Sequence, residues 1–339
     1  MTSTLFHRAL DVASNPQTRL VRYLILAVLL AALEPFLGTP YLIRIANWVL
    51  ILSVAAMGAN VVNGYAGLVS IAHAAFIAIG AYVSALAVMK LGVPFVAAAT
   101  LACLICGILS GAVGWLGNRV EPVYFLVVTL GIHVSVLLVI VNESWLTGGA
   151  NGLSAIPPAT IGPLVLSTDW AWYPVIVVSF TVALYLVQCL RESRPGRAMA
   201  AGRLNLPAAT ASGIDVNRNR ISAMVVGGIY FGVAGSMFAY VVRFLGPENF
   251  SMSLTLMLLL IVVVGGLGSN IGTCFSVLLV VGLTEVFRGA ATTWVLFYGI
   301  FIMVIMIVAP RGLADIWARV THGTRPQSLL ASLPEIRPK

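Results

Sequence analysis

The sequence predicts an all-α polytopic membrane protein with about ten transmembrane helices, because its residues are too apolar for a soluble fold and form long continuous runs. Hydrophobic residues fill 60% of the 339 positions, charged residues fill only 9%, and the mean hydropathy is +1.02. A soluble domain carries about 25% charged residues, so this chain could not cover a water-facing surface. The length of the runs excludes a transmembrane barrel, whose strands are short and alternate in polarity.

Apolar runs follow one another along the chain, and we expect each to cross the membrane once. Because a span needs about 20 residues, the run at 254–268 is short and the run at 23–37 requires tilt. The first run is expected to be retained, since no small-residue cleavage motif follows it. In chain order the runs are 23–37, 42–60, 65–89, 93–116, 123–141, 171–190, 221–242, 254–268, 271–287 and 291–309.

The distribution of basic residues predicts the orientation of the spans. Segment 191–220 holds six arginines and five basic residues lie from Arg311 onward, whereas 143–170 holds no lysine or arginine. Cytoplasmic loops carry an excess of Lys and Arg, so the first two regions are expected inside and the third outside. The same bias accounts for the net charge of +8, and no nucleic-acid partner is expected. The expected divisions are a cytoplasmic N-terminal segment at 1–22, a transmembrane domain at 23–310 and a cytoplasmic C-terminal tail at 311–339.

The two long loops differ in character. The external loop at 143–170 contains TGGANG and then three prolines, which predicts ordered bends. The cytoplasmic loop at 191–220 is rich in alanine on both sides of Pro207. We expect two short helices there, with the proline limiting the first and Gly213 capping the second. A polar segment of about 30 residues is unusually long for a connector, so we favour a docking element for a cytoplasmic partner over a solvated loop.

Segment 64–82, GYAGLVSIAHAAFIAIGAY, combines glycine, serine and histidine within an apolar run. Its AGLVS at 66–70 is echoed by GGLGS at 265–269 in the other half of the chain. Gly-interrupted segments in corresponding halves point to broken helices that line a transport path near mid-membrane. His73 in this segment, and His133 further along, are polar groups that need partners in a span. For both we favour a hydrogen bond to a neighbouring helix over contact with a solute or a gating role.

Motifs for catalysis or cofactor binding do not occur in the sequence. It has no P-loop, no H-E-x-x-H and no G-x-S-x-G, so we expect neither an enzyme nor a chain that holds ATP, a cofactor or a metal itself. Cys103 and Cys106 form a C-x-x-C, but they lie inside an apolar run and are expected to be small hydrophobes. Intramembrane carboxylates are scarce: Glu34 lies near a span end, and Glu285 has Arg288 three residues on as an expected ion-pair partner. An ion-coupled carrier or channel usually contains such acids, so this alternative is less favoured than an importer driven by a separate ATPase.

Five blocks of the sequence carry a resemblance to a known family. They are NGYAGLVSIAHAAFIAIGAY at 63–82, YFLVVTLG at 124–131, LTGGANGL at 146–153, SRPGRAMAAGR at 193–203 and PENFSMSLTLMLLLIVVVGGLGSNIG at 247–272. In order and spacing they resemble the membrane subunits of branched-chain amino-acid ABC importers, in particular the LivM-like subfamily. The first and last blocks are shared with sugar and amide importers, whereas LTGGANGL is more specific to the amino-acid branch. The resemblance therefore implies an importer permease for branched-chain amino acids, or for related small amino acids or amides.

The resemblance also implies partners and site residues. The implied fold is a type II ABC importer permease with Gly-interrupted helices in a bacterial inner membrane. It is paired with a second, related permease and two cytoplasmic ATPases, and an extracytoplasmic solute-binding protein delivers the solute. The solute is expected to pass between the permeases along Gly64, Gly67, Ser70, His73, Gly80, Gly265, Gly266, Gly268 and Ser269. The expected coupling residues toward the ATPase are Gly196, Arg197, Arg203, Ala208, Ala209 and Gly213. The external loop motif comprises Thr147, Gly148, Gly149, Asn151 and Gly152.

Overall fold

The computed structural model describes residues 16–34 and 38–286, together with residues 299 and 303. Seven helical segments in this part of the chain are long and apolar enough to cross a membrane, so the chain is an all-α polytopic membrane protein, as predicted. The predicted run at 291–309 lies outside the described residues. The seven segments are α3 (Pro40–Ala59) with the π-helical turn η2 (Asn60–Tyr65), α4 (His73–Leu91), α5 (Phe95–Gly117), α6 (Pro122–Asn142), α8 (Asp169–Glu192), α11 (Val216–Val242), and η4 (Pro247–Phe250) with α12 (Met252–Gly265). Two shorter apolar helices are α2 (Pro16–Ala32) and α13 (Asn270–Val286).

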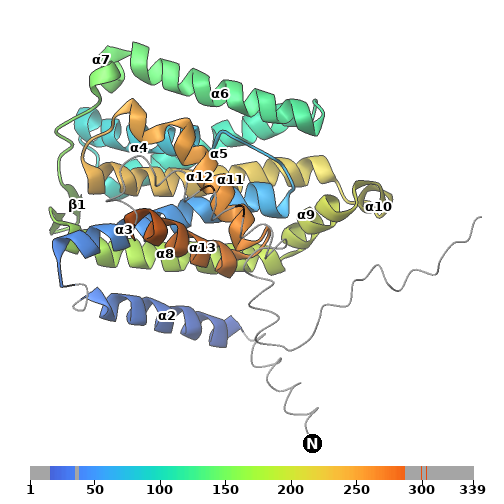
Figure 1. Cartoon of the computed structure of the whole chain (residues 1–339), viewed down its shortest axis with the longest axis horizontal. Coiled ribbons are helices and arrows are strands. Elements are labelled where there is room, and N and C mark those ends of the chain that lie inside the picture. The colour runs from blue at the N-terminus through green and yellow to red at the C-terminus, as the bar shows by residue number, and fades with distance from the viewer. Residues whose placement is uncertain (1–15, 35–37, 287–298, 300–302, 304–339) are drawn as a thin grey trace, which may run out of the picture.

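The long helices run side by side, with α6 at one edge of the bundle, α2 at the other and α11 between them (Figure 1). The connections gather at the two ends. One end, here called the hairpin end, holds α7 (Ser144–Thr147), η3 (Gly149–Asn151), β1 (Ala159–Ile161) and β2 (Leu164–Leu166). The opposite end, here called the α9 end, holds α9 (Arg194–Leu204) and α10 (Leu206–Ala211). The two loops that the charge pattern assigns to opposite sides of a membrane therefore lie at opposite ends of the bundle.

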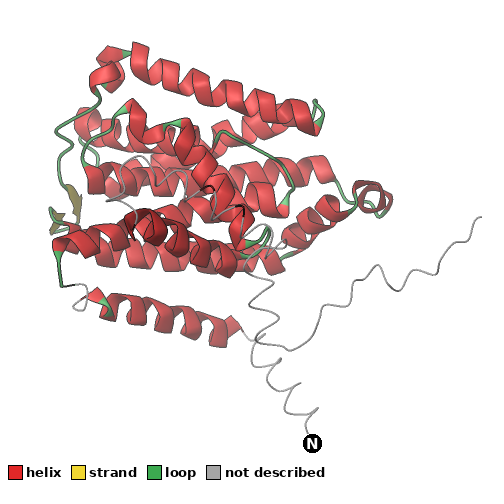
Figure 2. Ribbon diagram, in the orientation of Figure 1, coloured by secondary structure: helices red, strands yellow, loops and turns green. Residues whose placement is uncertain are grey.

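A small β-hairpin is the part of the 143–170 loop that the sequence did not predict (Figure 2). β1 and β2 are antiparallel, with Thr160 opposite Val165. Gly162 takes a φ of 59° in the turn between them, a conformation that glycine adopts without strain. The predicted bends are thus organised by two short strands.

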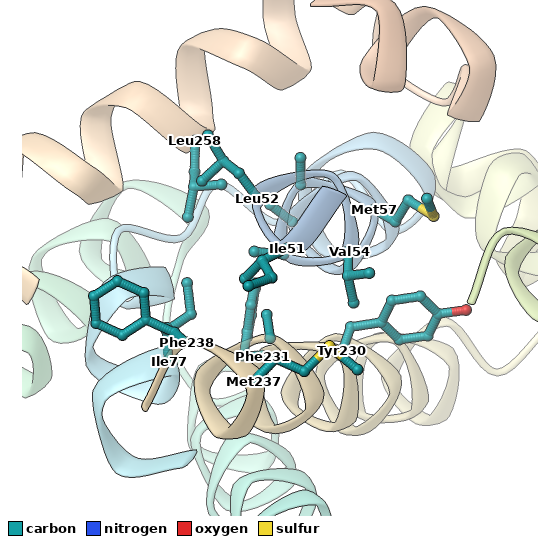
Figure 3. Packing of buried hydrophobic residues seen from close by; sticks show 14 of the residues in the cluster. Ile51, Leu52, Val54, Met57, Ile77, Tyr230, Phe231, Met237, Phe238 and Leu258 are labelled. Carbon is teal, nitrogen blue, oxygen red and sulfur yellow. The ribbon is translucent and has the colours of Figure 1, made fainter. Parts of the chain in front are cut away.

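The core surrounds α3. Figure 3 shows Leu52 of α3 directed toward Leu258 of α12, whereas Ile51 and Val54 lie toward Phe231 of α11. All five side chains are at most 3% exposed. Because α3 is covered from several sides, it is an interior helix of the bundle.

Glycines bring α4, α11 and α5 into backbone contact. A Cβ added to Gly80 of α4 would lie 2.8 Å from the Cα of Gly232 in α11, and a Cβ added to Gly232 would lie 2.8 Å from the Cα of Cys103 in α5. Small residues at such crossings allow membrane helices to approach closely. The three helices therefore form one tightly packed layer, here called the glycine layer.

The predicted spans at 65–89 and 254–268 begin or end differently in the structure. η2 ends at Tyr65 and α4 starts only at His73, which leaves residues 66–72 without helical structure. α12 ends at Gly265, and residues 266–269 form a turn before α13, with φ of 95° at Gly266 and 87° at Gly268. Hydropathy does not register these changes, because the non-helical residues are as apolar as their neighbours.

The α9 end contains the two predicted short helices, but the position of the proline differs. α9 ends at Leu204, and Asn205 caps α10 by accepting a hydrogen bond from the Ala208 amide at 3.1 Å. Pro207 lies in the first turn of α10, where backbone N–H groups have no partner within the helix, so the N–H that proline lacks is not needed there. Gly213 follows α10 with a φ of 78°, in agreement with its predicted capping role.

Candidate functional site

Two non-helical segments from opposite halves of the chain lie on either side of Arg203 near the α9 end. They are the break segment (residues 66–72) and the α12–α13 turn (residues 266–269). The amide of Gly268 donates to Asn60 Oδ1 at 2.9 Å, and a Cβ on Gly64 would lie 2.6 Å from the Gly268 nitrogen. Gly265 packs against the backbone of Gly272, so α12 and α13 lie close beside the turn. The α12–α13 turn thus packs directly on η2. Arg203 links the turn to the break segment, since a Cβ on Gly67 would lie 2.9 Å from Arg203 Cγ and a Cβ on Gly268 would lie 3.6 Å from Arg203 Nη1.

A buried network of amides holds this junction together. Asn60 Nδ2 donates to Asn270 Oδ1 at 3.2 Å, and the Tyr65 hydroxyl donates to the same oxygen at 2.7 Å. Asn270 Nδ2 in turn points to Gln188 Oε1 of α8 at 3.5 Å. Buried polar groups in a membrane bundle need such partners, and here they connect α3, η2, α8 and α13. The sequence reasoning missed Asn60 and Asn270, although an asparagine inside an apolar run is itself a signal.

A second set of polar groups surrounds the start of α4. Asn63 Nδ2 and His73 Nε2 lie 3.0 Å apart, and Asn63 Oδ1 accepts the Ser70 amide at 3.3 Å. The Ile71 amide donates to Thr129 Oγ1 of α6 at 3.1 Å, and the Ala74 amide donates to Thr255 Oγ1 of α12 at 3.1 Å. Of these residues, only Ser70 and His73 were predicted as site residues. The three that sequence reasoning missed are Asn63, Thr129 and Thr255.

The two histidines have different environments. His73 is hydrogen-bonded to the preceding helical turn, and its ring also lies 5.2 Å from that of Phe231. The expected hydrogen bond is therefore confirmed for His73. His133 is only 1% exposed, and neither of its ring nitrogens has a hydrogen-bond partner among the described residues. The prediction of a hydrogen bond to a neighbouring helix is wrong for His133 within this part of the chain.

Arg203 connects α9 to the break segment. Its Nη1 donates to the carbonyl oxygen of Gly64, and its aliphatic carbons pack on Gly67, where a Cβ would lie 2.9 Å from Arg203 Cγ. Gly67 has a φ of 68°, which favours glycine independently of the packing. Partial burial lowers the pKa of the Arg203 guanidinium, which still remains charged at neutral pH. A residue predicted to face the ATPase thus reaches into the bundle instead.

The other predicted coupling residues shape the ends of α9 and α10. Gly196 lies against the carbonyl of Leu190, and Arg197 donates to the Glu192 carbonyl oxygen. Of the two predicted coupling alanines in α10, Ala209 is buried at 4% exposure. The Ala208 amide is held by the Asn205 cap, and Leu204 beside it is 85% exposed. This end of the bundle therefore presents an exposed apolar side chain among arginines.

Gly80 belongs to the glycine layer and not to the junction. The close approach of Gly232 is enough to require glycine at this position, so no contact with a solute is needed to explain it. The remaining predicted path residue, Ser269, caps α13 by accepting the Gly272 amide at 3.2 Å. The structure thus places Gly64, Gly67, Gly265, Gly266, Gly268 and Ser269 at the junction and Ser70 with His73 at the start of α4.

The external loop motif forms a compact turn. Thr147 Oγ1 donates to the Ile140 carbonyl at 2.6 Å and accepts the Gly149 amide at 3.2 Å. Gly148, Gly149 and Gly152 have positive φ values of 80°, 62° and 72°. The next residue, Leu153, exchanges two backbone hydrogen bonds with Leu245, at 2.9 and 3.0 Å. These two bonds join the 143–168 loop to the α11–α12 connection. Asn151 is exposed on the turn, so its amide side chain can face outward.

An open cavity of about 720 Å³ lies beside the junction, between α2, α3, α8 and α13. Apolar side chains such as Leu26 and Phe275 make up most of its wall. Gln188 and Glu192 of α8 also line it, and Gln188 is the residue that reaches Asn270. The amide network therefore adjoins apolar open space.

The described residues contain no group of three His, Cys, Asp or Glu side chains that could hold a metal ion. Cys103 and Cys106 are free thiols, and Cys106 Sγ donates to the Phe76 carbonyl at 3.3 Å. Glu285 is at the end of the described part of α13, and its expected partner Arg288 lies outside the described residues. The polar chemistry of the junction comes from amides, hydroxyls, imidazoles and one guanidinium.

Comparison with known proteins identifies relatives over most of the chain. The family described as "Branched-chain amino acid transport system / permease component" matches residues 41–310. The high-affinity branched-chain amino acid transport system permease protein LivM of Escherichia coli (strain K12) is 29% identical over 333 residues, which cover 90% of this chain and 76% of the relative. LivM of Salmonella typhimurium (strain LT2) is 28% identical, with 91% and 77% covered. No solved structure matches the chain.

Proposed function

Since this chain belongs to the family of branched-chain amino acid transport permease components, we propose that it conducts a branched-chain amino acid along the break segment and the α12–α13 turn. The chain is a permease subunit of an ABC importer and not an enzyme. The observation that carries the proposed path is the junction itself. Irregular backbone at membrane depth is tolerated only where it is buried in protein or lines a polar cavity, and the junction places two such segments together.

The α9 end is the proposed docking surface for an ATPase. α9 and α10 project from the end of the bundle that carries the arginines of segment 191–220, which by the positive-inside rule faces the cytoplasm. Exposed Leu204 supplies an apolar contact at the tip. Arg203 then provides a direct connection from this surface to η2 and the break segment, since it bonds the Gly64 carbonyl and packs on Gly67. Movement of α9 would in this way reach the path without passing through the rest of the bundle.

The other partners follow from the same arrangement. The hairpin end would face the solute-binding protein outside the inner membrane, with Asn151 exposed on the turn of the external motif. A second, related permease would complete the path, with two ATPases on the cytoplasmic side. Both chain termini would lie in the cytoplasm.

Reconstitution into proteoliposomes tests the proposal. The chain is purified with its companion permease and ATPase and supplied with the binding protein, and uptake of radiolabelled leucine is measured with and without ATP. We expect uptake only when ATP and the ATPase are both present, and competition by isoleucine and valine but not by urea or acetamide. Uptake by the chain alone, driven by a proton or sodium gradient, would overturn the proposal in favour of an ion-coupled carrier.

A further inference from the structure

α4 begins inside the bundle and not at its surface. The ring of its first residue, His73, lies 5.2 Å from that of Phe231 at a tilt of 39°, and Phe231 is near the middle of α11 (Val216–Val242). A helix N-terminus carries a partial positive charge, and in membrane transporters the N-termini of half-helices point at anionic groups of the substrate. At 19 residues, α4 is long enough for this dipole to be fully developed. The position and polarity of this terminus therefore suit an anion at mid-depth.

The backbone donors at this terminus are incompletely used. Of the first three amides of α4, only that of Ala74 has a hydrogen-bond partner among the described residues, Thr255 Oγ1 at 3.1 Å. Hydroxyl groups stand nearby, since Ser70 Oγ accepts the Ala72 amide at 3.3 Å and Thr129 Oγ1 accepts the Ile71 amide at 3.1 Å. The amides of His73 and Ala75 and the Ser70 hydroxyl are therefore left to donate to a small acceptor, whereas the Thr129 hydroxyl already donates to the Leu126 carbonyl at 2.9 Å.

His133 is an independent sign that a ligand belongs here. It lies one turn after Thr129 on α6, so it shares the face of α6 that meets the break segment. The side chain is 99% buried, yet both ring nitrogens lack a partner in the part of the chain that the structure describes. A neutral imidazole offers one donor and one acceptor, and leaving both unmade in a buried site is costly unless a ligand uses them.

The charge around this point suits an anion. The segments that meet here are residues 60–72, α4, α6, α11 and α12, and none of them contains an aspartate or glutamate. A carboxylate entering the site therefore meets donors and a helix dipole without a like charge to repel it. An ammonium group would find no aspartate or glutamate in these segments to balance its charge.

We propose that the N-terminus of α4, together with His133, binds the carboxylate group of the amino acid as it crosses the membrane. The inference rests on the proposed function for the identity of the solute, and it adds the chemical group that is recognised and the residue that recognises it. His133 donates one N–H to the carboxylate, and the free amides at the start of α4 donate the others.

Thermal unfolding of the purified complex, without the binding protein, separates the chemical groups of the ligand. The probes are leucine, isovalerate, a branched acid with a carboxylate, no ammonium group and one carbon fewer than leucine, and leucinol, which keeps the ammonium group of leucine but lacks the carboxylate. We expect leucine and isovalerate to raise the unfolding temperature and leucinol not to do so, because only ligands that bind the folded state stabilise it. An equal shift with leucinol would overturn the proposal.

Variants of His133 assign the effect to this site. His133→Leu should abolish the shift with isovalerate and lower leucine uptake about tenfold, the loss of one charge-assisted hydrogen bond. His133→Gln keeps a donor and should retain part of both. Because the imidazole is unpartnered without ligand, His133→Leu should leave the ligand-free complex as stable as before or more stable, whereas a structural histidine would lose stability.

Ser84→Ala is the matched control. Ser84 is also on α4, and its hydroxyl is likewise buried and without a partner among the described residues, but it is eleven residues beyond His73. This variant should change neither the shift nor the uptake. If the wild-type complex imports leucine with ATP but His133→Leu does so equally well, the carboxylate site is wrong and the proposed function stands. If ATP-driven uptake is absent but the isovalerate shift depends on His133, the proposed function is wrong and the site stands.

Discussion

Arg203 and Arg197 lie on the same short helix and have different tasks. The sequence assigned both to contact with an ATPase. In the structure Arg203 turns inward to the carbonyl of Gly64, whereas Arg197 bonds the Glu192 carbonyl at the base of α9. A guanidinium can reach across from one element to another because of its length and its several donors. The two residues should therefore fail in different ways when they are replaced.

Arg203→Ala should uncouple ATP hydrolysis from transport. Losing the bond to Gly64 and the packing on Gly67 disconnects α9 from the break segment, so ATP hydrolysis should continue while leucine uptake falls about fivefold to tenfold. Since Arg203 stays charged at all physiological pH values, the loss should be independent of pH between 6 and about 8. Uptake per ATP hydrolysed in proteoliposomes is the measurement.

The contrast with Arg197 provides the control. Arg197→Glu should weaken copurification of the ATPase, because it reverses a charge on the proposed docking surface, whereas Arg203→Ala should copurify normally. Arg203→Lys keeps one donor and should recover part of the coupling. Normal uptake per ATP in Arg203→Ala would contradict the connecting role.

At the scale of elements, the glycine layer sets how close α4, α5 and α11 can lie. Gly80 and Gly131 offer a direct comparison, because both lie inside helices of the bundle. A Cβ on Gly80 would meet the Gly232 Cα at 2.8 Å, whereas nothing lies within 4 Å of a Cβ on Gly131. The same substitution should therefore have opposite effects at the two positions.

Gly80→Ala should destabilise the protein by about 1–3 kcal/mol, the typical result of overpacking a core. Gly131→Ala should stabilise it by up to about 1 kcal/mol, because alanine has the higher helix propensity and here meets no obstacle. Thermal unfolding in detergent compares the two variants with the wild type. Equal effects at both positions would show that backbone contact in the glycine layer does not limit stability.

Helices whose position depends on a long apolar run could be predicted from the sequence. Breaks whose position depends on a few hydrogen bonds between elements could not. Long apolar runs mark α3, α5, α6, α8 and α11 directly, because burial of a span depends on its summed hydropathy. The break at residues 66–72 depends instead on hydrogen bonds that its amides donate to Asn63 and Thr129, which belong to other elements. A hydropathy window cannot register partners that are distant in sequence.

The same contrast explains why only some residues of the candidate site could be predicted from the sequence. Gly67 and Gly268 stand out as glycines in paired motifs, and the side chain of Arg203 lies against both of them. Asn270 and Thr255 are single polar residues whose role appears only when their partners are known. His133 shows the converse case, since its sequence context suggested a hydrogen bond that the described residues do not supply.

At the scale of the whole molecule, the bundle has two chemically different ends. The hairpin end is assembled from the 143–168 loop and is joined through Leu153 to Leu245, whereas the α9 end carries the arginine-rich helices. The positive-inside rule assigns the α9 end to the cytoplasm. This assignment is open to direct labelling.

Single cysteines at the two ends should react from opposite sides. In a background without the native thiols at Cys103, Cys106, Cys189 and Cys274, we expect Asn151→Cys to react in intact cells with a membrane-impermeant maleimide. Leu204→Cys, at an 85% exposed position, should react only in inverted membrane vesicles. Labelling of both variants from the same side would contradict the proposed orientation.

The glycine layer also restricts how the protein can move. Where Gly80, Gly232 and Cys103 meet through main-chain atoms, there are few side-chain rotamers to change and little space to compress, and packed interiors rearrange by switching between discrete states. We therefore expect α4, α5 and α11 to travel as one rigid body. The alternation between states open to the two sides of the membrane then falls to the helices on its flanks, α6 on one side and the α12–α13 pair on the other. The start of α4 stays fixed while its surroundings open and close.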